Sequence, residues 1–325
     1  MRRLLFILTI TLMSAQSLVG QDAQFSQFYS SPLYLGPSFA GATGQSRIIA
    51  NYRNQWVSLP SAYSTYAFSF DHFVDKYRSG VGLLLFNDQE GGTYNSTIAS
   101  LSYSYMIDIN EKIKMRPGLQ AAYYSRHINY GDLRFADAIM RNSGTSIETP
   151  VNENVSHYDF AFSVITYTDN MWIGATGNHL LALNKQFADD YSYPSLKLTA
   201  FGGMRYKFAE RVRTMEDKFL SLSFFFKHQA GFHQLDVGAN YEQDPFRIGL
   251  WFRGVPALSE SADLNAVVLL VGTTIKDLFI NYSYDISTSR LLSATGGAHE
   301  ISIAYRFDMG IRERKKKSAL PCPHF

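Results

Sequence analysis

Apolar side chains alternate with small or polar ones along this chain, in segments of about ten residues, from near Ser46 to near Phe307. Between Asn95 and Ile107 the odd positions are Asn, Thr, Ala, Leu, Tyr, Tyr and Ile, and the even positions between them are Ser, Ile, Ser, Ser, Ser and Met. A period of two indicates β-strands, because successive side chains of a strand point to opposite faces of the sheet. One apolar face and one small polar face, repeated many times, is typical of a transmembrane β-barrel.

The N-terminus has the composition of a secretory signal peptide. Arg2 and Arg3 precede the apolar run Leu4–Met13, and residues 14–20 are small or polar. We therefore expect residues 1–20 to be removed and the mature chain to begin at Gln21. The apolar run is too short to cross a membrane as a helix, and no later stretch approaches the ~20 apolar residues that a spanning helix needs.

The composition excludes several classes of protein. The only cysteine, Cys322, rules out a disulfide framework and disfavours a cysteine-based zinc site. A net charge of +2 provides no general attraction for nucleic acid, and the one dense basic run, Arg312–Lys317, is confined to the C-terminal tail. We expect that tail to be solvated.

The alternating segments can be counted. The pattern predicts fourteen strands, an even number, as in bacterial barrels whose two ends lie on the same side of the membrane. They are expected at 46–56, 62–73, 78–88, 94–107, 112–126, 157–168, 171–178, 194–208, 218–228, 232–242, 245–253, 263–274, 276–286 and 297–308.

The connections between these segments differ in length according to side. Most connections after even-numbered strands are short, whereas those after odd-numbered strands include the long segments 127–156, 179–193, 254–262 and 287–296. Short periplasmic turns and long extracellular loops are the asymmetry of outer-membrane barrels. The predicted organisation is a signal peptide at 1–20, an N-terminal periplasmic or plug segment at 21–45, an all-β outer-membrane barrel at 46–308 and a basic periplasmic tail at 309–325.

The last predicted strand shows which face meets lipid. Ile301, Ile303 and Tyr305 share one face, and Glu300 and Arg306 share the other. Exposing a charged side chain to the middle of the bilayer costs about 2–4 kcal/mol, so the charged face is expected to line the lumen.

No arrangement of residues in the sequence indicates catalysis or a cofactor. His228 and His233 are five residues apart across a predicted turn, which is poor spacing for metal ligands, and there is no HExxH or G-x-S-x-G motif. We expect a protein that is not an enzyme and that holds no metal or cofactor.

A series of ordered motifs resembles the PorP/SprF family of outer-membrane proteins associated with the type IX secretion system. The motifs are Gln24–Tyr29, Ser31–Leu35, Phe39–Gly41, Asn51–Trp56, Phe86–Gly92, Gly118–Ala121, Gly131–Phe135, Asp236–Tyr241, Tyr282–Asp285, His299–Phe307 and the ending Cys322–Phe325. The sequence departs from the family where Val57–Pro60 follows Trp56, because many members place Pro directly after the Trp.

The resemblance implies partners rather than substrates. Members of the family resemble anchors and accessory barrels that hold a secreted protein, often a large gliding adhesin, by its C-terminal domain at the cell surface. Others resemble components linked to the periplasmic part of the secretion machine. The long loops 127–156 and 179–193 are rich enough in aromatic residues to form a capture surface.

The segment Tyr52, Arg53, Asn54, Gln55 and Trp56 is the candidate site for contact with a plug or a partner. In one interpretation, Arg53 and Gln55 project into the lumen and hold residues 24–34 or touch a substrate. In the other, which we favour, Tyr52 and Trp56 belong to the interfacial aromatic girdle. Arg53 is then a luminal ion-pair partner of Glu300 or Asp71.

A second class of function fits the same barrel. A passive porin, or a channel for hydrophobic solutes of the fatty-acid type, would also have an N-terminal segment inside the lumen. In that case apolar luminal residues such as Ile98 would line the path. Conductance would favour the channel, and co-purification with an exported protein would favour the anchor.

Overall fold

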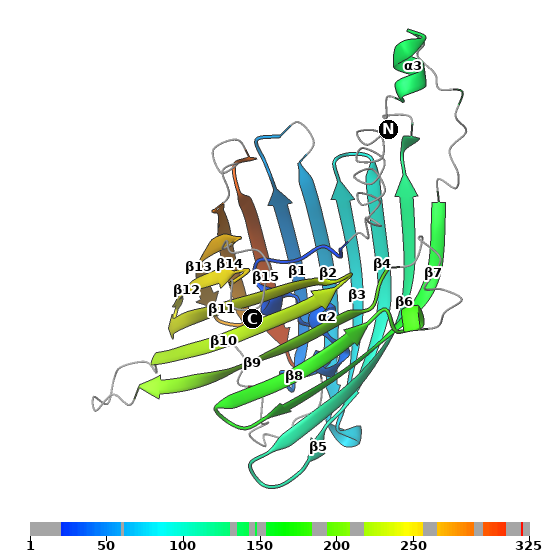
Figure 1. The fold of residues 1–325 in the computed structure, drawn as a ribbon. Coiled ribbons are helices and arrows are strands. Elements are labelled where there is room, and N and C mark those ends of the chain that lie inside the picture. Colours follow the sequence, from blue (N-terminus) through cyan, green and yellow to red (C-terminus); the bar gives the residue numbers. More distant parts are fainter. Residues whose placement is uncertain are drawn as a thin grey trace, which may run out of the picture.

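The strands of the computed structural model close into one antiparallel barrel. The structure describes residues 21–59, 62–130, 135–142, 147, 154–183, 194–208, 218–255, 265–288, 295–309 and 320. Strand β4 (Tyr94–Tyr105) pairs with β6 (Lys114–Ile128) and so completes the ring. The two-residue β5 (Ile107–Asp108) continues β4 along the same edge of β6. Because β4 and β5 share one position in the wall, the fifteen strands fill fourteen positions around the barrel (Figure 1).

All fourteen predicted strands are present, and none of their bounds differs from the prediction by more than three residues. The remaining strands are β1 (Ser46–Gln55), β2 (Tyr63–Val74), β3 (Ser79–Glu90), β7 (Asn154–Tyr167), β8 (Met171–Asn178), β9 (Lys197–Phe208), β10 (Lys218–Gln229), β11 (Phe232–Gln243), β12 (Phe246–Arg253), β13 (Ala266–Ile275), β14 (Leu278–Ser287) and β15 (Ala298–Phe307). Short helices are η1 (Phe28–Ser30), α2 (Pro32–Leu35), η2 (Pro37–Phe39), η3 (Asp75–Tyr77), α3 (Ala136–Met140) and η5 (Leu180–Leu183).

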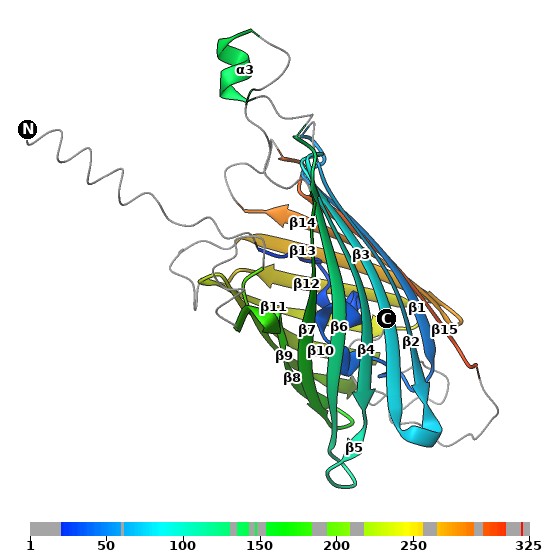
Figure 2. The same ribbon diagram turned by 90° about the vertical axis from the view of Figure 1, so that its right-hand side faces the viewer.

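The two ends of the barrel differ as the sequence predicts. The barrel begins at Ser46 and ends at Phe307, and these two residues are paired at one end. The short connections η3, Asp244–Pro245 and Lys276–Asp277 lie at that end, which is the periplasmic one. Helix α3 projects beyond the opposite end (Figure 2).

The two faces of the wall also agree with the prediction. In β15, Ile301, Ile303 and Tyr305 are exposed on the outer surface, whereas Glu300 and Ser302 are fully buried on the luminal side. Eleven of the strands carry at least one large apolar residue that is more than two-fifths exposed, and this is the surface that lipid covers. No helix among the described residues is long and apolar enough to cross a membrane.

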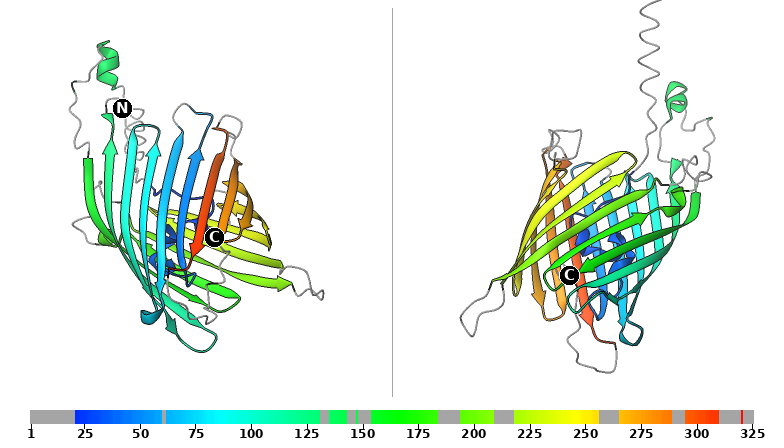
Figure 3. Two further views of the ribbon diagram at one scale, coloured as in Figure 1. Left: turned by 180° about the vertical axis from the view of Figure 1, so that it is seen from behind. Right: turned by 60° about the horizontal axis from the view of Figure 1, so that its bottom comes forward.

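The first described residues of the chain lie inside the barrel. Residues 21–45, here called the luminal segment, include η1, α2 and η2 and run through the lumen before β1 begins (Figure 3). Almost all of its side chains from Phe25 to Ala42 are buried. The lumen of this barrel is therefore occupied by its own chain.

Candidate functional site

Apolar side chains of the luminal segment pack against both halves of the inner wall. Phe25 and Leu33 share one buried cluster with Leu84, Phe86 and Ile98. Ile98, a candidate for lining a greasy path, therefore packs against the segment. A second cluster includes Phe28, Tyr29, Leu35 and Phe39, together with Ile49, Ile165, Tyr167, Trp172, Phe201, Phe225, Trp251 and Leu270 from seven strands. The segment is thus the apolar core that an empty barrel would lack.

Glycines in the wall allow the backbone of the segment to approach closely. A Cβ on Gly80 would lie 1.9 Å from the Ala40 carbonyl oxygen, and one on Gly118 would lie 2.4 Å from the Ser38 nitrogen. In both cases the obstacle is backbone rather than the end of a movable side chain. The wall can accommodate residues 37–41 at Gly80 and Gly118 because these two positions carry no side chain.

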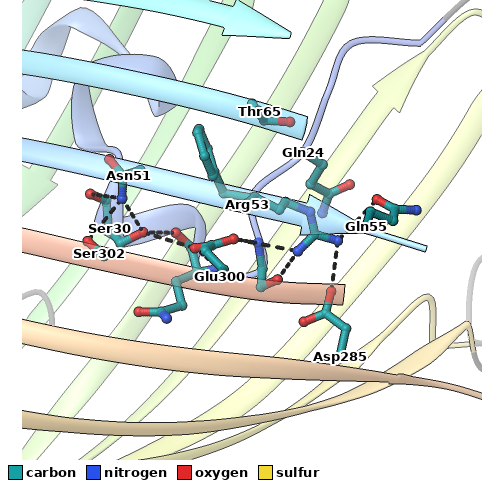
Figure 4. Close-up of polar contacts among 12 residues, drawn as sticks. Gln24, Ser30, Asn51, Arg53, Gln55, Thr65, Asp285, Glu300 and Ser302 are labelled. Carbon is teal, nitrogen blue, oxygen red and sulfur yellow. Dashed lines mark hydrogen bonds and ion pairs between the residues drawn. The ribbon is translucent and has the colours of Figure 1, made fainter. Parts of the chain in front are cut away.

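A buried ionic cluster fixes the middle of the segment. Arg53 Nη2 donates to Asp285 Oδ2 at 2.9 Å, and Arg53 Nη1 lies 3.5 Å from Glu300 Oε2. Arg53 also donates to the Ser26 hydroxyl of the luminal segment (Figure 4). Arg253 Nη1 contacts the same Asp285 oxygen at 2.7 Å, so two guanidinium groups flank one carboxylate.

Glu300 and Asn51 hold the turn that follows. Glu300 accepts hydrogen bonds from the backbone amides of Ser26 at 2.5 Å and Gln27 at 3.3 Å. Asn51 Nδ2 donates to the Ser30 carbonyl at 3.2 Å and to the Ser302 hydroxyl at 2.9 Å (Figure 4). Buried polar groups are costly without partners, so these bonds fix the path of the segment as well as its presence.

A second ionic cluster holds the beginning of the segment near the extracellular end. Asp22 Oδ2 accepts from Lys197 Nζ at 2.6 Å and lies 2.9 Å from His179 Nε2. His179 Nδ1 is 2.6 Å from Asp159 Oδ2, so the imidazole bridges the wall and the segment. Gln229 completes the site with its amide, which donates to Asp22 Oδ1 and accepts from the Asp22 backbone nitrogen, both at 3.1 Å.

The charges at this end shift two ionisation equilibria. Burial alone would raise the pKa of the Asp22 carboxyl, but His179 and Lys197 together hold it well below its usual range. Burial alone would lower the pKa of the His179 imidazole, but Asp22 and Asp159 outweigh it and raise that pKa. The two carboxylates thus favour the charged form of the His179 imidazole more than water does.

These shifts give the attachment of Asp22 a pH dependence. The raised pKa of His179 means that its contribution is complete below its ordinary pKa of about 6.5 and is lost as the pH rises through the raised value. The lowered pKa of Asp22 means that its contribution is complete above about 3.9 and is lost as the pH falls through the lowered value. The difference in melting temperature between the wild type and His179→Gln should therefore shrink in alkaline buffer. A difference independent of pH would contradict this.

The predicted contact segment divides between the two faces of the wall. Tyr52 faces outward and packs on Tyr66 at 5.0 Å, and Trp56, at a φ of 61°, packs on Tyr63 at 4.8 Å. Asn54 occupies the outward phase of β1, and Gln55 accepts a hydrogen bond of 3.2 Å from Arg53.

Arg53 makes a contact from each of the two interpretations. It pairs with Glu300, as in the structural one, and it also contacts the luminal segment, as in the other. Asp71, the alternative partner, instead pairs with Arg47 at 2.9 Å and accepts from the Gly41 amide.

Other sequence expectations meet the structure only in part. The loop expected at 127–156 is shorter than predicted, because β6 extends to Ile128 and β7 begins at Asn154. His228 and His233 face each other across β10 and β11 with 3.1 Å between their Nδ1 atoms, closer than their separation in sequence suggests. The expected signal peptide at 1–20 and the basic run 312–317 lie outside the described residues. Leu320, within the tail expected to be solvated, is buried and donates its amide to the Ala42 carbonyl.

The extracellular ionic cluster was not among the sequence candidates. Its members are Asp22, Asp159, His179, Lys197 and Gln229, and they come from five separate stretches of the chain. The only signal in the sequence is that Asp159, Lys197 and Gln229 occupy the inward phase of their strands. That phase places a residue in the lumen but does not reveal its partner.

A closed antiparallel barrel with an apolar outer face and a polar inner face is an outer-membrane β-barrel. The family model described as "Type IX secretion system membrane protein PorP/SprF" matches residues 17–305. The chain belongs to this family, and it is an outer-membrane barrel of the type IX secretion system. The resemblance seen in the ordered motifs is confirmed.

Solved structures with some similarity are also outer-membrane barrels. Omp33 of Acinetobacter baumannii is 8% identical over 81% of this chain and 99% of its own, with a TM-score of 0.45. The CymD monoaromatic hydrocarbon channel is 13% identical over 89% and 95%, with a TM-score of 0.44. A Pseudomonas aeruginosa FadL homologue is 11% identical over 82% and 90%, with a TM-score of 0.39. Similarity of this extent identifies no ligand or activity. A search of curated proteins finds no match for the chain.

Proposed function

We propose that this barrel holds an exported protein of the type IX system at the cell surface by that protein's C-terminal domain. A large surface protein, such as a gliding adhesin, is the kind of partner that the family implies. The role needs no catalysis and no cofactor.

Exposed apolar side chains above the barrel carry this proposal. Helix α3 lies in the extracellular segment between β6 and β7, where Ile139 is 64% exposed and Met140 is 81% exposed. Ile147 in the same segment is 72% exposed. Apolar side chains gathered in water, outside the lipid-covered wall, are typical of a surface that binds another protein.

The occupied lumen supports an anchor over a passive channel. The luminal segment fills the space with two apolar clusters, and both ionic clusters fasten it to the wall. A passive channel would require this segment to leave or to admit solute around it. Purified wild-type barrel in a planar bilayer should accordingly show little steady conductance.

The double variant Ile139→Asp, Met140→Asp tests the anchor directly. Loss of two apolar contacts at the centre of an interface typically costs about 2 kcal/mol or more, so surface retention of the exported protein should fall about ten-fold or further. Retention is measured by protease shaving of intact cells and by the amount of exported protein in the medium.

A matched variant and a null strain control this experiment. Ile109→Asp changes another apolar residue that is more than half exposed, at the opposite, periplasmic end, and should leave retention unchanged. A strain without the barrel gives the full loss. Normal retention in that strain would refute the anchor.

A further inference from the structure

The wall has its shortest ladder between β7 and β8. Only Phe162–Tyr167 of β7 pair with β8, which gives six residue pairs. Among the described residues, this is the smallest number between strands at neighbouring positions in the wall. On its other side β7 pairs with β6 without interruption from Asn154 to Tyr167. Among the described residues, 154–161 therefore have a strand on one side only, and Figure 1 shows β6 and β7 rising beyond the end of β8.

Where the pairing with β8 stops, the carboxylate of Asp159 accepts hydrogen bonds from nearby backbone amides. The Phe160 amide donates to the Asp159 carboxylate at 2.7 Å, and the Leu181 amide of η5 reaches the same oxygen at 3.4 Å. Helix η5 lies beside this edge, but among the described residues no backbone group bonds to the β8-facing side of residues 154–161. In the part of the chain that the structure describes, the main-chain groups of Ser156 and Tyr158 on this side therefore have no strand partner.

This edge has only some of the features that usually protect an exposed strand. Natural edges are blunted by Lys, Pro, bulges, extreme shortness, inward-pointing charges or a covering helix or loop. Residues 154–161 read NVSHYDFA, without Lys or Pro, and their register with β6 advances one residue for one. The protective features present are the inward charge of Asp159, which is 2% exposed, and the adjoining η5, and both lie at the end of the edge nearest Phe160.

The outward side chains place the edge at the extracellular membrane surface. Tyr158 is 70% exposed and packs on Tyr123 of β6 at 5.4 Å, as in an aromatic girdle. Phe160 lies one step below it, toward the lipid, and Ser156 and Asn154 lie above it, toward water. The unpaired edge thus begins in water and reaches the membrane interface.

We propose that residues 154–161 of β7 accept a β-strand of the exported protein, which extends the sheet through main-chain hydrogen bonds. This inference rests on the proposed function and specifies how the partner is held. An edge presents its amide and carbonyl groups at every second residue, a spacing that another extended chain satisfies. A strand arriving from the extracellular side meets the polar part of the edge first, and the lipid-facing part last.

Proline substitution separates main-chain pairing from side-chain contact. The Phe160 amide faces away from β6, so the amides of Tyr158 and Ser156, in the same phase of the strand, face the same edge. The variant Ser156→Pro, Tyr158→Pro removes both edge amides and spares the pairing with β6, as proline does in edge strands. The matched variant Ser156→Ala, Tyr158→Ala removes the side chains and keeps the amides.

The expected result is a difference between these two variants. Both should assemble, as shown by heat-modifiable migration. The proline variant should lose surface retention of the exported protein by about ten-fold, from two missing hydrogen bonds, and the alanine variant should retain it. Equal retention in the assembled proline variant would overturn the proposal, as would equal loss in both variants.

A second measurement identifies the occupant of the edge. In purified barrel without partner, the amides of Ser156 and Tyr158 should exchange rapidly with solvent deuterium, and they should become protected in the complex. Protection in the barrel alone would mean that the chain covers its own edge, which would also overturn the proposal. If the strain without the barrel loses retention while the proline variant does not, the anchor stands and the strand addition fails.

Discussion

Replacing Arg53 by alanine should lower the free energy of unfolding by about 3–5 kcal/mol, the usual cost of removing one partner from a buried ion pair. Arg53 is 4% exposed, and its loss leaves Asp285 with Arg253 alone and Glu300 without a cation at 3.5 Å. The Ser26 hydroxyl loses its donor as well, so the luminal segment should be released in the same variant. The measurement is the urea midpoint of heat-modifiable migration in detergent.

An exposed ion pair provides the control for Arg53. Arg78 pairs with Asp108 at the periplasmic end, and both side chains are about two-fifths exposed. Arg78→Ala should change the free energy of unfolding by less than about 1 kcal/mol. If Arg53→Ala assembles with unchanged stability but no longer retains the exported protein, Arg53 is a partner contact and its structural role is wrong.

Replacing Gly80 by alanine should displace the end of the luminal segment and open a path for ions. The added Cβ would lie 1.9 Å from the Ala40 carbonyl oxygen, so residues 37–41 must move. Overpacking of this kind typically costs about 1–3 kcal/mol. Displacement would also break the bond from the Ser104 hydroxyl to Ala40 and the bonds from Arg116 to Ala40 and Gly41. Single-channel recording should show a conductance that the wild type lacks.

Gly177→Ala is the matched substitution for this experiment. A Cβ at Gly177 would lie 3.4 Å from the nearest atom, an ordinary contact with the movable side chain of Leu180. This variant should remain as closed as the wild type. Conductance in both variants, or in neither, would show that the contact between Gly80 and Ala40 does not close the lumen.

The local pattern of the sequence was enough to predict the wall. The two faces of β15 follow from period two alone, because a strand must place alternate side chains on opposite faces. The prediction of ion pairs was less complete. The sequence offered Glu300 or Asp71 for Arg53, and the structure adds Asp285 and assigns Asp71 to Arg47. Alternation identifies the inward side of a strand, but strand tilt and register decide which inward residues meet.

The sequence by itself determined the strands, the face of each that meets lipid, the distinction between the two ends of the barrel and the family. These features are local or are carried by ordered motifs. Only the tertiary structure decided the path of residues 21–45, whose contacts with Glu300 span 274 residues, and the joining of Asp22, His179 and Asp159. It also decided where the ladder between β7 and β8 stops. The alternation of side chains is a property of each strand by itself. The lumen and the unpaired edge arise only when the strands close into a barrel.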